Sequence, residues 1–257
     1  MLKTRVIPTL LWKDYGLVKG VAFNSWRRVG TVLPALKVYN TRDVDELVLV
    51  DITASQEGRG PDHVSVADFS DECSVPLTVG GGIQAVQQIV HLLRAGADKV
   101  SLNSAALSNP DLVDQAARQF GAQCVVASID ARRMGDGLYE VFSHSATRAT
   151  ARNPVVWARE LEARGAGEIL LTSIDRDGTL QGYDVPLVEK VSAAVTIPVI
   201  ASGGAGTYQH MVDVIRQGGA SAVAAASMFH FTQQTPAGAK QALERAGIAV
   251  RRNFQVV

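Results

Sequence analysis

The sequence predicts a single (β/α)8 barrel, or TIM barrel, over residues 1–257, built from two similar half-barrels. Three observations predict this fold. The length matches the roughly 250 residues typical of such a barrel. Short β-branched runs alternate with helical patterns eight times, and the second half of the chain resembles the first. An open doubly wound sheet is the alternative, and it is less favoured because no G-x-G-x-x-G motif opens the first helix.

The predicted strands are short apolar runs, which are typical of a parallel sheet that is covered on both faces. In chain order they are Arg5–Leu11, Glu46–Ile52, Val75–Val79, Lys99–Asn103, Cys124–Asp130, Glu168–Ser173, Ile197–Ser202 and Ala222–Ala226. Three helix starts are each marked by a capping residue that is followed by proline at the first helical position. They are Asn109-Pro110, Asn153-Pro154 and Thr235-Pro236.

The internal repeat has a constant spacing. Pro76 matches Pro198, and Glu46 matches Glu168, both at an offset of 122 residues. Two separate segments rarely share one offset by chance. The halves therefore contain strands one to four and five to eight, and the fold should have an approximate two-fold axis.

Composition excludes several classes of function. The formal net charge is zero, so the basic surface that nucleic-acid binding needs is not expected. No apolar run approaches the ~18 residues of a membrane span. Cys73 and Cys124 have no ligand spacing and the five histidines are scattered, so we expect no metal site and reduced thiols in the cytoplasm. No cofactor is implied.

Two glycine-rich turns suggest anion binding. Gly80-Gly81-Gly82 and Gly203-Gly204-Ala205-Gly206 each end a predicted strand and open a helix. Glycine there lets backbone N–H groups approach an anion, next to a helix N-terminus. The next strand ends, Asn103-Ser104 and Ala226-Ser227, would complete each cradle. One such turn is equally well explained as a tight βα turn, but two related by the repeat favour a substrate with a phosphate at each end.

Polar residues stand between the two cradles at predicted strand ends, where barrels of this type carry out chemistry. They are Asp51, Asp130, Thr172, Asp177 and Ser202. Asp130 ends an apolar run, so its carboxyl group should be partly desolvated and suited to acid/base catalysis.

The segment that follows the sixth strand contributes Asp177 and Gly178, in a loop that we expect to be flexible and able to close over substrate. For Asp175 and Arg176 a local turn or ion pair is the favoured interpretation. Lys19, after the first strand, would meet a phosphate or an anionic intermediate, or else be a solvated loop lysine.

Charged residues begin four of the strands and should lie at the other end of the barrel: Arg5, Glu46, Lys99 and Glu168. Two positive and two negative side chains there would either plug the base of the barrel or gate a passage along its axis. The residues alone leave both possibilities open.

Long motifs resemble the HisF family, the cyclase subunits of imidazole glycerol phosphate synthase. They include Asp45-Glu-Leu-Val-Leu-Val-Asp-Ile-Thr-Ala-Ser, Leu77-Thr-Val-Gly-Gly-Gly-Ile, Gly165-Ala-Gly-Glu-Ile-Leu-Leu-Thr-Ser-Ile-Asp-Arg-Asp-Gly-Thr and Ala226-Ser-Met-Phe-His-Phe. The resemblance implies a heterodimer with a glutaminase, whose ammonia crosses the barrel and attacks a bis-phosphorylated ribulosyl substrate. It also implies that the four charged residues form the ammonia gate, that Asp98 contacts the glutaminase and that Asp130 is catalytic.

One departure from this family stands out. Its first catalytic aspartate falls here on Leu11, and the internal repeat pairs Leu11 with Asp130 at an offset of 119 residues. A missing acid/base group should lower cyclase turnover by at least ~10²-fold. Asp14 is a possible substitute, although it would lie beyond the strand end.

The departure predicts a different function. Pro8-Thr-Leu-Leu-Trp-Lys-Asp resembles the WbuZ-type paralogues found with surface-polysaccharide (O-antigen) genes. In these, ammonia serves acetamidino-sugar formation together with a separate sugar amidotransferase, and this is the main hypothesis here. A histidine-pathway cyclase is the alternative, and a non-catalytic scaffold that activates a glutaminase is a third.

Overall fold

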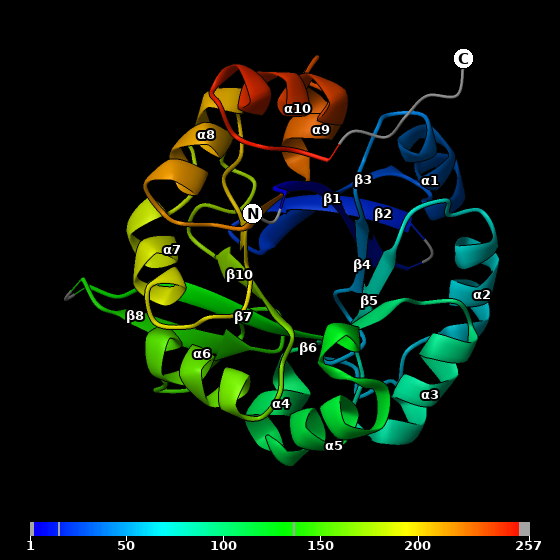
Figure 1. Cartoon of the computed structure of the whole chain (residues 1–257). Coiled ribbons are helices and arrows are strands. Elements are labelled where there is room, and N and C mark those ends of the chain that lie inside the picture. The colour runs from blue at the N-terminus through cyan, green and yellow to red at the C-terminus, as the bar shows by residue number, and fades with distance from the viewer. Residues whose placement is uncertain (1–2, 15, 136, 252–257) are drawn as a thin grey trace.

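The computed structural model describes residues 3–14, 16–135 and 137–251, and these form a closed parallel barrel surrounded by helices (Figure 1). Its eight parallel strands are β1 (Arg5–Lys13), β4 (Leu47–Asp51), β5 (Leu77–Gly80), β6 (Lys99–Leu102), β7 (Val125–Arg133), β10 (Glu168–Ser173), β11 (Val199–Ser202) and β12 (Ala222–Ala225). Each strand pairs with the next in this order, and β12 pairs with β1 to close the ring. The predicted (β/α)8 barrel is confirmed.

The helices lie outside the barrel, between consecutive strands of the chain or, for the last two, after β12. They are α1 (Val32–Asn40), α2 (His63–Asp71), α3 (Val86–Arg94), α4 (Ser104–Ser108), α5 (Asp111–Phe120), α6 (Pro154–Ala163), α7 (Val185–Ser192), α8 (Tyr208–Arg216), α9 (Ser227–Phe231) and α10 (Pro236–Arg245), with a 3-10 turn at Ala122–Cys124. Among the described residues no helix is long and apolar enough to cross a membrane.

Two of the three predicted helix starts are confirmed. The Asn153 side chain accepts hydrogen bonds from Val155 N and Val156 N before α6, and Thr235 caps α10. At Asn109-Pro110 the prediction is one residue early, because α5 begins at Asp111 and Pro110 precedes it. Asn109 instead follows the short helix α4.

Two antiparallel extensions continue the barrel beyond its carboxyl end, and the sequence analysis missed both. Strand β1 runs two residues past Leu11 and pairs with the hairpin of β2 (Gly16–Val21) and β3 (Asn24–Gly30). Strand β7 likewise runs past Asp130 and pairs with β8 (Tyr139–Ser143), which pairs with β9 (Arg148–Ala149). The first strand of each half-barrel therefore carries an extension.

The apolar core has two parts because successive side chains of a strand point to opposite faces. Val6 and Leu10 pack outward against the helices, whereas Ile7 points into the barrel. The interior cluster consists of Ile7, Val48, Val126, Leu170, Ile200, Ala222 and Ala224. These side chains fill the barrel between its two ends, which leaves the polar groups to the ends.

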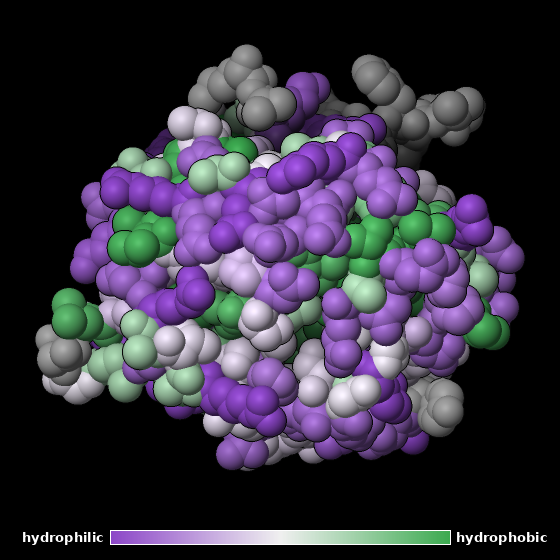
Figure 2. All heavy atoms as spheres, turned by 90° about the horizontal axis from the view of Figure 1, so that it is seen from below, coloured by the Kyte–Doolittle hydropathy of each residue, from purple (hydrophilic) through white to green (hydrophobic). Residues whose placement is uncertain are grey.

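The helices cover this core with amphipathic faces. Leu112, Val113 and Ala116 of α5 are buried against the barrel. Figure 2 shows the side where α4 and α5 lie: it is mostly hydrophilic, and its hydrophobic side chains form small, separate patches. This is the surface expected of helices that bury one face.

Candidate functional site

A cavity opens at the carboxyl ends of the barrel strands, and almost all of the predicted substrate residues line it. These are Asp51, Gly81, Gly82, Asn103, Asp130, Thr172, Asp177, Gly178, Ser202, Gly203, Gly204, Ala226 and Ser227. Because parallel strands all end on the same side of a barrel, residues from both halves of the chain meet there.

The first glycine turn has a backbone that other residues adopt poorly. Gly81 and Gly82 have φ angles of 105° and 72°. A Cβ at Gly81 would lie 2.2 Å from the Asp51 carbonyl oxygen, and one at Gly82 would lie 2.4 Å from that of Arg59. The Gly82 N–H points to the hydroxyl of Ser55 at 3.3 Å. Both glycines line the cavity, but the turn precedes α3 by several residues and does not open the helix as predicted.

The second turn repeats this geometry. Gly203 and Gly204 have φ angles of 88° and 104°, and a Cβ at Gly204 would lie 2.1 Å from the carbonyl oxygen of Gly182. Here too the glycines lie in the loop before the helix, since α8 begins at Tyr208. Next to each turn, a strand ends and a short helix begins, at Ser104 in the first half and at Ser227 in the second. The repeat in the sequence thus produces two matching cradles on one rim.

Asp130 lies between the cradles, on β7. Its carboxyl group is buried and accepts a hydrogen bond of 2.6 Å from Asn103 Nδ2. Burial, and secondly the charge of Asp177, raise the pKa of Asp130 to about 7, against hydrogen bonds from Asn103 and Thr172 that act in the opposite direction. A carboxyl group with a pKa near neutrality exchanges protons readily at physiological pH.

Asp177 and Lys19 are a second pair of titratable residues near Asp130. Burial raises the pKa of Asp177 to about 6 against the opposing charge of Lys19. Lys19 is a buried residue of β2, where burial lowers its pKa to about 7 and its Nζ donates to the Thr9 carbonyl at 2.7 Å. The alternative of a solvated loop lysine is wrong, because the β1–β2 hairpin folds Lys19 inward. Its contact with a phosphate stays a prediction.

The loop that carries Asp177 is a compact turn packed against the β2–β3 hairpin. Ala22 N donates to the Asp177 carbonyl at 2.9 Å. A Cβ at Gly178 would lie 2.0 Å from the Gly20 carbonyl oxygen. Asp175 and Arg176 lie in the predicted local turn, and the ion pair of Asp175 is with Arg132 of β7 at 3.7 Å rather than with a residue of the same loop.

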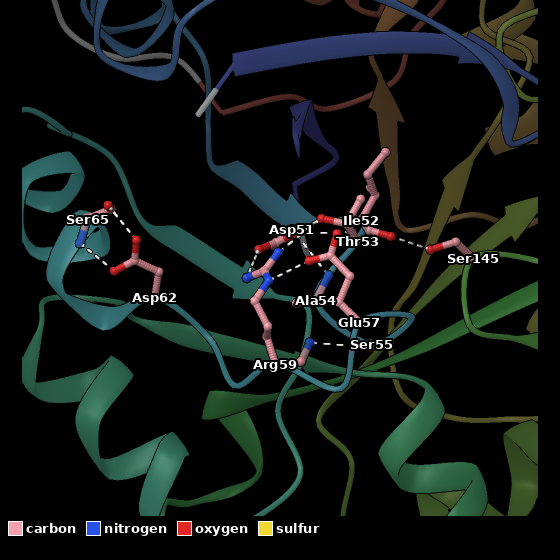
Figure 3. A network of polar contacts seen from close by, with 11 residues as sticks. Asp51, Ile52, Thr53, Ala54, Ser55, Glu57, Arg59, Asp62, Ser65 and Ser145 are labelled. Carbon is pink, nitrogen blue, oxygen red and sulfur yellow. Dashed lines mark hydrogen bonds and ion pairs between the residues drawn. The ribbon is translucent and has the colours of Figure 1, made fainter. Parts of the chain in front are cut away.

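Asp51 has contacts that sequence analysis did not foresee. Its Oδ1 accepts hydrogen bonds from Thr53 N, Thr53 Oγ1 and Ala54 N, and its Oδ2 pairs with Arg59 at 3.1 Å (Figure 3). Arg59 also contacts Glu57 and the Thr53 hydroxyl. The carboxylate therefore holds the loop after β4 against the first cradle, while its predicted contact with substrate stays a prediction.

The four charged residues meet at the opposite end of the barrel. Arg5 contacts Glu46 at 2.8 Å and Glu168 at 2.9 Å, and Lys99 contacts Glu46 at 2.9 Å and Glu168 at 3.2 Å. The pairs close into a ring at the amino ends of strands β1, β4, β6 and β10, with Glu46 directly before β4. Asp98, one residue before Lys99, is exposed on this end, and its carboxylate accepts a hydrogen bond from Leu77 N.

Comparison with known proteins decides the family. The model of the histidine biosynthesis protein family matches residues 5–235. The imidazole glycerol phosphate synthase subunit HisF of Hyphomonas neptunium (strain ATCC 15444) is 53% identical over 251 residues, which cover 98% of this chain and 99% of that protein. The chain belongs to the HisF family. As a HisF-family chain it is an enzyme subunit of the cyclase-like type.

These comparisons correct the main functional hypothesis. They support the HisF cyclase of histidine biosynthesis, which was the alternative, better than acetamidino-sugar formation in O-antigen synthesis. The resemblance to WbuZ-type paralogues stays a prediction. It rests on Leu11, which lines the cavity of this HisF-family chain. Asp14 does not supply the missing carboxylate, because it is exposed in the β1–β2 turn and is absent from the described residues around the cavity.

Other cavity residues of this HisF-family chain escaped the sequence analysis. Phe23 and Trp26 of the β2–β3 hairpin line the cavity, as do Ser101 and Ser128, whose hydroxyls are 3.0 Å apart. The serines interrupt apolar strands, and that interruption is a usable signal. The described residues contain no cluster of three or more histidine, cysteine or acidic residues that would hold a metal ion.

Proposed function

We propose that this chain is the cyclase subunit of an imidazole glycerol phosphate synthase of histidine biosynthesis, and that it uses ammonia from a partner glutaminase of the HisH type. One observation carries the proposal. A buried carboxyl group that titrates near neutral pH, Asp130, stands between two anion cradles at one end of a barrel whose other end is closed by a ring of ion pairs.

The two cradles suit a bis-phosphorylated ribulosyl substrate. Each offers backbone N–H groups at positive φ angles, which approach an anion without a side chain between them. A substrate with a phosphate at each end would span the rim and bring its middle over the site between Leu11 and Asp130. Phosphate contacts of this kind position the reacting atoms and lower the entropic part of the barrier.

The ring of Arg5, Glu46, Lys99 and Glu168 supports ammonia entry from the opposite end. Ammonia is neutral and small, so it needs only a transient separation of the ion pairs, whereas a larger or charged solute would need to displace a buried side chain. Asp98 lies on the same exposed end and would contact the glutaminase. Asp130 would then take and return the protons that move as ammonia adds and the ring closes.

The sugar-amidation hypothesis remains a second candidate because of Leu11. An apolar side chain where the repeat places the counterpart of Asp130 removes one of two expected acid/base groups. In that reaction, and in the scaffold alternative, the barrel would deliver ammonia or activate the glutaminase without closing an imidazole ring.

Reconstitution tests the proposal. The chain, purified with a HisH glutaminase, should form imidazole glycerol phosphate from the bis-phosphorylated substrate with glutamine or with ammonium salts. Asp98→Ala should lower only the glutamine-dependent rate. Growth of a strain that lacks the histidine-pathway cyclase should be restored by the wild-type chain and not by Asp130→Asn. Glutaminase activation without product would overturn the cyclase assignment.

A further inference from the structure

One wall of the cavity is apolar and has no part in the proposed proton transfers. Leu11 of β1, Val50 of β4 and Trp26 of the β2–β3 hairpin line it. In the order of the barrel strands, β1 lies opposite β7, so this wall faces Asp130 across the cavity. The mouth therefore has Asp130 on one side and this apolar wall on the other, with Asp51 at the end of β4 beside the wall.

The hairpin places Trp26 on the same face as Leu11. Leu11 pairs with Val18 in the antiparallel β1–β2 ladder, and paired residues project to the same face. Gly20, two residues after Val18, lies on the same face of the strand as Val18. The indole ring of Trp26 lies over Gly20, where an added Cβ would be 2.7 Å from the ring carbon Cε3. The missing side chain at Gly20 thus makes room for the indole and for the Asn24 carbonyl oxygen, which an added Cβ would approach to 2.4 Å.

The other face of the hairpin contacts helix α9 on the barrel exterior. The guanidinium of Arg27 lies 5.1 Å from the ring centre of Phe231 in α9. Trp26, the preceding residue of β3, points away from this contact and lines the cavity. The backbone bond from Ala22 N to the Asp177 carbonyl ties the hairpin tip to the turn beside the second cradle.

We propose that Trp26 and Leu11 form a subsite for a planar heteroaromatic ring that carries a phosphorylated side chain. A flat ring held between the two cradles would stack on the indole and rest on the leucine, and both contacts remove apolar surface from water. Stacking of nucleic-acid bases on aromatic side chains stabilises complexes by about 1–3 kcal/mol. The subsite rests on the proposed function, since the reaction named for the relative creates an imidazole ring.

A matched pair of ligands isolates the ring. Imidazole glycerol phosphate and glycerol phosphate share a phosphate and differ in the ring, and calorimetry with the full chain gives the affinity for each. The wild-type chain should bind the ring-bearing ligand at least about fivefold more tightly. Equal affinities would overturn the subsite alone. If neither compound binds, the phosphate cradles of the proposed function fail, and the subsite fails with them.

Variants assign the preference to the indole. The quantity compared is the ratio of the affinity for imidazole glycerol phosphate to that for glycerol phosphate. Trp26→Ala should lower this ratio to about one, and Trp26→Phe should retain part of the preference. Gly20→Ala should reduce the ratio by displacing the indole ring. The control is Arg27→Ala. The Arg27 side chain points to the opposite face of the same hairpin, so its removal should leave the affinity ratio unchanged. Ring binding should also quench tryptophan fluorescence in the wild type and not in Trp26→Phe, because Trp12 and Trp157 are only 6% and 1% exposed. If Trp26→Ala kept the wild-type affinity ratio, the assignment of the ring preference to the Trp26 indole would be refuted.

Discussion

Replacing Asp130 by asparagine should lower activity and raise stability above neutral pH. The carboxyl group is buried, and its pKa of about 7 lies well above the value of about 4 that it has in an unfolded chain. At pH 8 the folded protein holds an ionised and poorly solvated carboxylate, which costs about 4 kcal/mol relative to a neutral group. Asparagine has the same shape and still offers an oxygen to Asn103, without the charge.

The sign of the effect follows from proton linkage. Between about pH 4 and pH 7 the folded protein keeps a proton on Asp130 that the unfolded chain has released, so rising pH favours unfolding across this range. Above pH 7 the folded protein has also released this proton, and the loss of stability is complete. Because asparagine does not titrate, the stability difference between Asp130→Asn and the wild type should grow by about 3 kcal/mol from pH 5 to pH 8. Urea unfolding at the two pH values measures it.

A control of the same chemistry should behave differently. Asp62 caps α2; burial raises its pKa, but hydrogen bonds from Ser65 outweigh this and lower it. Asp62 is ionised at both pH values, and asparagine caps a helix about as well as aspartate, so Asp62→Asn should change the stability by the same small amount at each pH. If the stability difference between Asp130→Asn and the wild type were also the same at pH 5 and pH 8, the desolvation argument would be refuted. Asp130→Asn should also lose at least about 10²-fold in turnover with ammonium salts, as expected for the loss of an acid/base group.

Three further substitutions test other parts of the site. Leu11→Asp should raise cyclase turnover with ammonium salts by up to about 10²-fold if the second carboxylate is what the site lacks; an unchanged kcat would show that it is not. Lys19→Met should stabilise the fold most near pH 7 and progressively less toward pH 10, because the folded chain has released the Lys19 proton in that range while the unfolded chain retains it; urea unfolding at pH 7 and pH 9.5 checks this. Gly204→Ala should raise KM for the bis-phosphate more than it lowers kcat, since its Cβ would lie 2.1 Å from the Gly182 carbonyl oxygen; an unchanged KM would count against the second cradle.

The barrel was predictable because its strands are apolar on both faces. The predicted strand Glu168–Ser173 coincides with β10, and the other starts and ends differ by three residues or fewer. The same feature brought the strand-end residues to one cavity, since a parallel barrel leaves no other place for them. Asp130 was identifiable because a charged residue directly follows a run of buried ones.

The hairpins gave no comparable signal. Strand β3 is polar and largely exposed, so it shows no apolar period. Its turn from β2 uses Ala22 and Phe23 at positive φ, in place of the glycine or asparagine that normally marks such a turn. The tertiary contacts of the hairpin with the Asp177 turn stabilise this backbone, and they are invisible in the sequence. Trp26 was missed for that reason.

The two halves of this chain share a fold but divide the chemistry unequally. Each half supplies a glycine cradle at the same rim, because the cradle depends on backbone conformation, which the repeat preserves. The acid/base function depends on single side chains, and there the repeat has diverged to Asp130 in one half and Leu11 in the other. With no carboxylate on β1, Asp177 is the acidic neighbour whose charge raises the pKa of Asp130. In the proposed cyclase, proton transfer would therefore be concentrated in one half of the barrel, and the opposite wall would be free to bind an apolar surface of the substrate.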